Sequence, residues 1–165
     1  MARPAEPDVA DNGEIMTDIL DTLQSEHEAL DKLLKKLNDT TDSAVKTRTE
    51  LLAQIEPKLL GHAKGEEAVF YPAFAERGDH EDLQANAEAW QEHRSLEKCV
   101  LPDLKKADPG SRQFAGSAKV LMEFVEHHAK EEEGGIFASM RKLYSEAERG
   151  ELDQRYKAWK TKNGF

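Results

Sequence analysis

Apolar residues recur at alternating steps of three and four along most of this 165-residue chain. That period matches the α-helix, which takes about 3.6 residues per turn, and it places each set of residues on one face of a helix. One set falls near residues 14–38, and similar sets follow near 43–76, 80–106 and 112–144. Strand-like alternation is absent. The sequence therefore predicts an all-α fold.

Turn-forming segments separate the four sets, and they read NDTTDS, ERGDHED and KKADPGS. Four long helices with short connections are expected to pack as an up-down-up-down four-helix bundle. We expect the bundle at residues 14–145, a disordered tail before it at 1–13, and a short C-terminal helix and tail at 146–165. Pro57 is expected to kink the second helix, and Pro72 to end it near Tyr71.

The composition argues against several classes of function. A formal net charge of −10 repels phosphate backbones, so no nucleic acid is expected as a partner. A single cysteine, Cys99, supports neither a disulfide framework nor a cysteine-based zinc site. The chain lacks both the long apolar run of a membrane span and the apolar core of a signal peptide. We therefore expect a cytoplasmic protein with no membrane partner.

Two nearly identical phrases occur in the chain, HAKGEE at 62–67 and HAKEEE at 128–133. Within each phrase a histidine precedes a glutamate by four residues, so His62 and Glu66 share a helix face, as do His128 and Glu132. Both pairs continue the apolar stripe of their helix and are expected to point into the bundle. An ionised carboxylate there needs a positive partner, and no Lys or Arg occupies these stripes. A metal ion would provide that partner.

The first and third helices extend the pattern. His27 and His93 lie in the apolar stripes of these helices, and the interval between them equals the interval between His62 and His128. The chain thus resembles two helical hairpins related by a pseudo-twofold axis, which would bring four histidines and two glutamates to one interior place. That set predicts a site for two metal ions.

Plainer interpretations exist for each of these residues. A single core histidine is usually a hydrogen-bonding residue, and a buried polar core can instead serve specificity of packing. His80 and His127 lie off the stripes and are expected in solvent. Glu67 and Glu133 are expected either at the surface or beside the site, rather than among its ligands. Leu152, Tyr156 and Trp159 are expected to cap the bundle.

The pattern His27…His62-x-x-x-Glu66…His93…His128-x-x-x-Glu132 resembles the hemerythrin-like, HHE cation-binding family over about residues 15–145. The phrase HAKGEEAVFYPAF is similar to that family's second helix. The resemblance implies a four-helix bundle with a non-haem di-iron centre whose two Fe ions share an oxo or hydroxo group. It also implies that His27 and His62 bind one iron, that His93 and His128 bind the other, and that Glu66 and Glu132 bridge them.

One position departs from the oxygen-carrying members of the family. They place a fifth histidine one turn after the third-helix histidine, where this chain has Glu97 as a possible ligand. The last acidic ligand also follows its histidine by four residues rather than five. The chain therefore looks like the bacterial non-carrier branch, which includes peroxide-decomposing, nitric-oxide-responsive and iron- or oxygen-sensing proteins.

Ligand chemistry narrows the expected cofactor and leaves two functions open. Imidazole and carboxylate ligands together suit iron, with manganese as the less favoured alternative. The ligand set leaves an open position on each iron, unless Glu97 binds, and open positions are where O₂, peroxide or NO would react. The Glu-x-x-His pattern of ferritin-like di-iron proteins is absent. We expect a peroxide-decomposing enzyme, catalase- or peroxidase-like, with an external redox partner, or else a non-enzymatic O₂, NO or iron binder or sensor.

Overall fold

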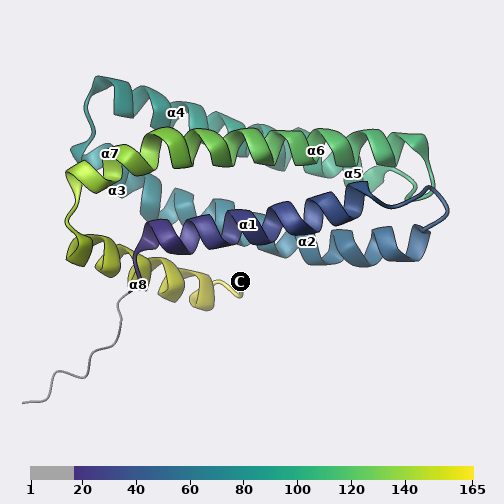
Figure 1. The fold of residues 1–165 in the computed structure, drawn as a ribbon, viewed down its shortest axis with the longest axis horizontal. Helices are drawn as coiled ribbons and strands as arrows, with labels where there is room; N and C mark the ends of the chain where they lie inside the picture. The colour runs from purple at the N-terminus through teal and green to yellow at the C-terminus, as the bar shows by residue number, and fades with distance from the viewer. Residues whose placement is uncertain (1–16) are drawn as a thin grey trace, which may run out of the picture.

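The computed structural model describes residues 17–165, and the tail predicted at 1–13 lies outside the described residues. Within the described range every regular element is a helix, so the all-α prediction is confirmed. Helices α1, α2, α4 and α6 run along the long axis of the molecule, and helix α8 lies beside one end (Figure 1). No helix in this range is long and apolar enough to cross a membrane.

Four long helical segments make up most of the described chain. The first is α1 (Ile19–Asn38). The second joins α2 (Val45–Gly65), the π-helical segment η1 (Glu66–Phe70) and α3 (Tyr71–Arg77). The third joins α4 (His80–Ser95), η2 (Leu96–Val100) and α5 (Leu101–Lys106). The fourth joins α6 (Arg112–Glu131), η3 (Glu132–Ile136) and α7 (Phe137–Leu143). Helix α8 (Glu146–Lys162) follows.

Side-chain caps fix where most of these segments begin. Asp18 accepts a hydrogen bond from the Leu20 backbone N–H at the start of α1, and Ser111 accepts one from Phe114 at the start of α6. Capping boxes open α4, through Asp79, and α8, through Ser145. Such caps satisfy backbone N–H groups that have no partner inside the helix.

The predicted end of the second helix near Tyr71 is wrong, because the helix continues to Arg77. Pro57 lies inside α2, and the kink expected there stays a prediction. Pro72 occupies the first turn of α3, directly after the π-helical segment η1. The wider π turn has already changed the backbone hydrogen-bond ladder there, so the N–H that proline lacks does not end the helix.

Two apolar clusters fill the interior, one toward each end of the long helices. The first contains Leu23, Phe70, Phe74 and Met140, and the second contains Leu30, Leu59, Phe114 and Leu121, among others. Each long segment passes from one cluster to the other, and its predicted site residues fall between the two. The histidines and glutamates therefore form a polar layer with an apolar core on both sides.

Candidate metal centre

The structure brings the six predicted metal-site residues together in this polar layer. Side-chain ligand atoms of His27, His62, Glu66 and Glu132 lie within 4.8 Å of one another, and those of Glu66, His93 and His128 form a second such group. All six are buried, and the most exposed of them, His128, retains only 7% of its accessible surface. Three of them lie in α-helices one turn from a π-helical segment, and both glutamates begin such a segment.

Glu66 lies between the two pairs of histidines. Its Oε1 is 3.2 Å from Nε2 of His62, and its Oε2 is 3.4 Å from Nε2 of His93. The carboxylate therefore presents one oxygen to each histidine pair. That is the arrangement a bridging carboxylate requires.

Glu132 repeats the arrangement from the fourth segment. Its Oε2 is 3.3 Å from Nε2 of His27, and its Oε1 is 3.6 Å from Nε2 of His128. The imidazole rings of His27 and His62 have centroids 4.7 Å apart, and those of His93 and His128 are also 4.7 Å apart. The two carboxylates thus connect two histidine pairs of nearly equal spacing.

Several of these atoms are buried without a hydrogen bond in the described part of the chain. They are both carboxylate oxygens of Glu66, Oε2 of Glu132, and Nε2 of His27 and His62. A buried carboxylate without a partner costs several kcal/mol, roughly, whereas a cation in contact with it removes the cost. The orphaned atoms are all metal-ligating types and face one another, so the residues fit a metal site.

The pKa shifts within the polar layer also favour a bound cation. Burial, followed by repulsion from Glu132, raises the pKa of Glu66 well above its usual value. Burial opposes ionisation of Glu132 too, but His128 and His27 hold the pKa of that carboxyl below its usual range. Burial lowers the pKa of His62 to about 4, so its ring is neutral at pH 7 and one ring nitrogen keeps a lone pair. Two carboxylates this close need a cation to be ionised together.

A glutamate contacts Nδ1 of every one of the four histidines. The Nδ1–carboxylate distances are 2.8 Å for His27 to Glu133, 2.9 Å for His62 to Glu26, 3.3 Å for His93 to Glu67 and 2.6 Å for His128 to Glu92. A carboxylate on Nδ1 favours the tautomer that leaves Nε2 free, and it fixes the orientation of the ring. All four Nε2 atoms can therefore face the metal position.

Glu26 and Glu92 were not among the residues predicted for the site. Each directly precedes a predicted ligand, His27 or His93, yet contacts the histidine of the neighbouring helix instead. The two glutamates occupy equivalent positions of the internal repeat, and that equivalence was a usable signal. Glu67 and Glu133 lie beside the site, one of the two locations expected for them.

Tyr71 is a further residue that the helical period did not indicate. Its hydroxyl donates a hydrogen bond to Oε1 of Glu132 at 2.6 Å and lies 3.1 Å from Nε2 of His93. Burial raises the pKa of Tyr71 well above its usual value, so the hydroxyl keeps its proton. The equivalent position in the second half of the repeat is Phe137, whose ring stacks on His27 at 6.1 Å between centroids. The two halves of the centre are therefore chemically different.

Glu97, the possible seventh ligand, does not reach the centre. It forms ion pairs with Lys64 and Lys98 instead, and these two lysines hold its pKa below the usual range. His80 is exposed at the start of α4. His127 keeps 62% of its side-chain surface exposed.

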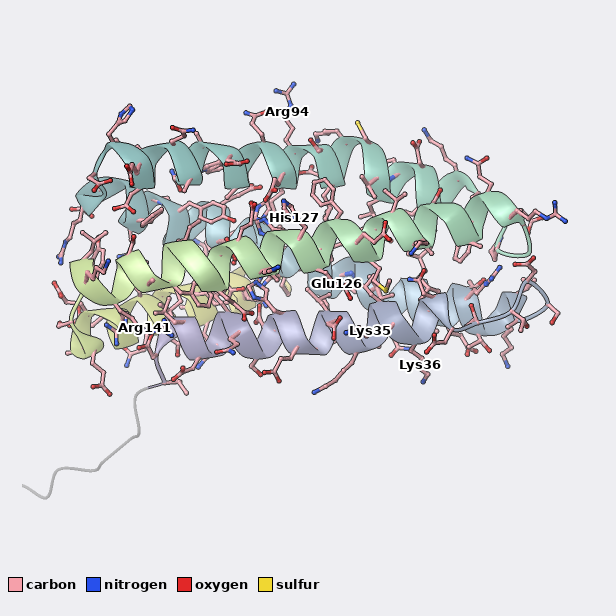
Figure 2. All side chains as sticks on the ribbon, turned by 45° about the horizontal axis from the view of Figure 1, so that its top comes forward. Lys35, Lys36, Arg94, Glu126, His127 and Arg141 are labelled. Atoms are coloured by element: carbon pink, nitrogen blue, oxygen red, sulfur yellow. The ribbon has the colours of Figure 1, made fainter. Side chains whose placement is uncertain are left out.

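A groove of about 560 Å³ runs between α1 and α6 and reaches the outer edge of the centre. Its lining includes His27 and Glu133 at one end and Val125 and Ala129 along its wall. Lys35 of α1 and Glu126 of α6 lie across it from each other, with Nζ and Oε1 3.6 Å apart (Figure 2). The groove provides a route by which a small molecule could approach His27.

A helical protein with two carboxylates placed between two histidine pairs belongs to the class of helix-bundle metal-binding domains. The family model described as "Hemerythrin HHE cation binding domain" matches residues 18–139. The chain therefore belongs to the hemerythrin HHE cation-binding family.

One curated relative broadens the comparison. A DNA nickase from Nostoc sp. (strain PCC 7120 / SAG 25.82 / UTEX 2576) is 27% identical to the chain over 147 residues. The matched region covers 87% of this chain but only 39% of the nickase, so the chain spans about two fifths of that relative's length. No solved structure matches the chain.

Proposed function

We propose that this chain is a non-haem di-iron protein whose centre binds and decomposes peroxide. The observation that carries the proposal is the position of Glu66, a fully buried carboxylate with one unpaired oxygen toward each histidine pair. In the proposed site His27 and His62 would hold one ion, His93 and His128 would hold the other, and Glu66 and Glu132 would contribute to both. Mixed imidazole and carboxylate ligands suit iron, and manganese is the alternative.

Iron in this site would supply one- and two-electron chemistry toward O₂, peroxide or NO. The residues of the chain supply the surroundings. The four glutamates on the Nδ1 atoms orient the histidines, and the apolar clusters on both sides of the layer exclude water. Tyr71 holds the carboxylate of Glu132 and keeps an O–H group beside His93. The groove at His27 offers a route for the peroxide.

We also propose that the four long segments alternate in direction about a pseudo-twofold axis through the centre. The order in which they meet the apolar clusters supports this. The first segment passes from Leu23 of one cluster to Leu30 of the other, and the second returns from Leu59 to Val69. The third and fourth segments meet the clusters in the same order, from Ala89 to Leu96 and from Val125 to Ile136.

The alternative function is a non-enzymatic module that binds or senses O₂, NO or iron. The burial of all six residues favours ligands of diatomic size, which supports this alternative as well. Oxygen evolution from added peroxide, normalised to bound iron, separates the two functions. An enzyme should show turnover that Glu66→Gln abolishes, whereas a binder should show ligand-dependent spectra without turnover.

Metal analysis tests the di-iron proposal directly. We expect close to two irons per chain after anaerobic reconstitution, and loss of the paired centre in Glu66→Ala and Glu132→Ala. His27→Ala should weaken one ion more than the other. The exposed His80→Ala and His127→Ala are matched controls that should keep full metal content. Equal losses from all six histidine variants would show non-specific binding and would overturn the proposal.

The activity named for the nickase relative is not part of the proposal. The chain spans only 39% of that protein, and its net charge of −10 disfavours contact with DNA. We expect metal-loaded protein to leave supercoiled plasmid intact at physiological salt. Metal-dependent conversion to the nicked circle, lost in Glu66→Gln, would assign DNA as a substrate of this centre.

A further inference from the structure

Helix α8 lies outside the four long segments, yet it reaches the metal centre through Glu26. The hydroxyl of Tyr156 donates a hydrogen bond to Glu26 Oε2 at 2.6 Å, and Nζ of Lys160 donates one to Oε1 at 2.7 Å. The same carboxylate contacts Nδ1 of His62 at 2.9 Å. Three donors from two elements therefore fix the carboxylate that orients His62.

The equivalent carboxylate in the second half has no such support. Glu92 contacts Nδ1 of His128 at 2.6 Å through Oε2, and Nε2 of His127 lies 3.9 Å from its Oε1, beyond hydrogen-bond distance. No tyrosine or lysine of the described residues donates a hydrogen bond to Glu92. The two histidines that occupy equivalent places are thus held in different ways.

Two buried glycines on one face of α2 leave room for α8 and the residues after it to pack closely against that face. A Cβ atom on Gly65 would lie 2.4 Å from Cε2 of Tyr156, and one on Gly61 would lie 2.9 Å from Phe165. The equivalent positions in the second half of the repeat hold Glu131 and His127, which are exposed. The same face of the helix is therefore covered by α8 in the first half and open to solvent in the second.

We propose that Tyr156 and Lys160 are positioning residues that hold His62 through Glu26, so that α8 sets the metal affinity of one half of the centre. The inference rests on the proposed two-metal site, and it concerns only residues of this chain. Tyr156 is fully buried, and its hydroxyl is the only part of the side chain that bonds to Glu26. Removing that hydroxyl alone should loosen the carboxylate while the packing of the ring is kept.

The test uses the full chain, stripped of metal and titrated with Co²⁺ as the probe. Tyr156→Phe and Lys160→Met should each weaken one of the two binding steps by about 10-fold, the lower end of the effect of residues that orient metal ligands. The other step should change much less. Lys160→Arg should retain wild-type affinity, because it keeps a cation beside Glu26.

A matched control lies one turn away on α8. Lys157 also pairs with an acid, Asp153, and bonds Thr17, but it does not contact Glu26. Lys157→Met should therefore remove an ion pair of α8 and leave both binding steps unchanged, because the contacts of Tyr156 and Lys160 with Glu26 are kept. Thermal melting of each metal-free variant reports on any general loss of stability.

Proton NMR of the Co²⁺ protein separates positioning from a structural role. The ring N–H protons of metal-bound histidines shift far outside the ordinary range, and they vanish in D₂O. In Tyr156→Phe one of these signals should move and the others should stay. If Tyr156→Phe and Lys160→Met match wild type in both binding and spectrum, or if all signals change together, the inference is overturned. If wild type itself binds fewer than two ions, the proposed function fails first.

Discussion

Tyr71→Phe removes a single hydroxyl from the interior of the candidate metal centre. Its hydrogen bond to Glu132 spans 2.6 Å, and the acceptor is a buried carboxylate that the neighbouring histidines keep ionised. Hydrogen bonds to charged groups contribute about 1.5–3 kcal/mol, so metal-free protein should lose free energy of unfolding in that range. The ring itself should pack well, because phenylalanine already fills the equivalent position at Phe137.

Urea unfolding in the presence of a chelator measures this loss. At a slope of about 2 kcal/mol per molar urea, a loss of about 2 kcal/mol lowers the unfolding midpoint by about 1 M. Tyr144→Phe is the matched control, because that hydroxyl donates to the neutral carbonyl of Ala73 at 2.7 Å. The control should cost about 0.5–1.5 kcal/mol, as neutral hydrogen bonds do.

Adding metal should change the cost of Tyr71→Phe but not that of Tyr144→Phe. A cation on Glu132 takes over part of the charge compensation, so the cost of Tyr71→Phe should fall in the metal-loaded protein. The cost of Tyr144→Phe should stay constant. If Tyr71→Phe costs no more than Tyr144→Phe without metal, or if metal leaves the difference between them unchanged, the hydroxyl of Tyr71 does not stabilise an ionised Glu132.

Three further predictions concern the metal, the contact with α8 and the surface. Removing metal should lower the melting temperature, because Glu66 and Glu132 are left buried with unpaired oxygens; calorimetry of chelated and loaded protein checks this. Gly65→Ala should lower the free energy of unfolding in urea by about 1–3 kcal/mol, since its Cβ would overlap the ring of Tyr156. Gly134→Ala is the control and should not destabilise the protein, because there is open space around Gly134. Glu97→Ala should keep full metal content by elemental analysis, because its partners are Lys64 and Lys98; loss of one ion would return Glu97 to the ligand set.

The helical fold and the residues of the polar layer were predictable because two independent signals coincide. The period of three and four residues identifies the buried face of each helix. The internal repeat then shows which polar residues on that face occur in both halves of the chain. His27, for example, falls between Leu23 and Leu30 on its face, which places it in the interior whatever the partner helices are. The structure brings the six predicted residues together, and their role as ligands stays a prediction.

What the sequence could not indicate depends on contacts between helices or on departures from the α-helical period. The internal repeat could have singled out Glu26, but only the packing of α1 against α2 shows that it contacts His62 and not its neighbour His27. Tyr156 was expected to cap the bundle, and its hydrogen bond to Glu26 depends on where α8 lies. Tyr71 follows Glu66 by five residues, which is about 140° away on an α-helix but close to one turn of a π-helix.

The π-helical segment η3 provides a direct test of that last point. The Phe137 N–H bonds to the carbonyl of Glu132, a step of five residues, and Gly135 lies between them with open space around it. Deleting Gly135 would shorten that step to four, the α-helical spacing, and would leave Glu132 and Phe137 facing inward on either side.

Deletion of Gly135 should therefore keep metal content and cost little stability. Deletion of Ala138, an equally small and exposed residue of α7, is the matched control. Helix α7 has no π turn, so deleting one residue rotates Met140 by about 100° about the helix axis and out of the core. Losing that fully buried side chain should cost about 2–5 kcal/mol in urea unfolding. If the two deletions destabilise the protein equally, η3 does not contain one extra residue that the helix can lose. The same explanation for the position of Tyr71, after η1, would then be wrong.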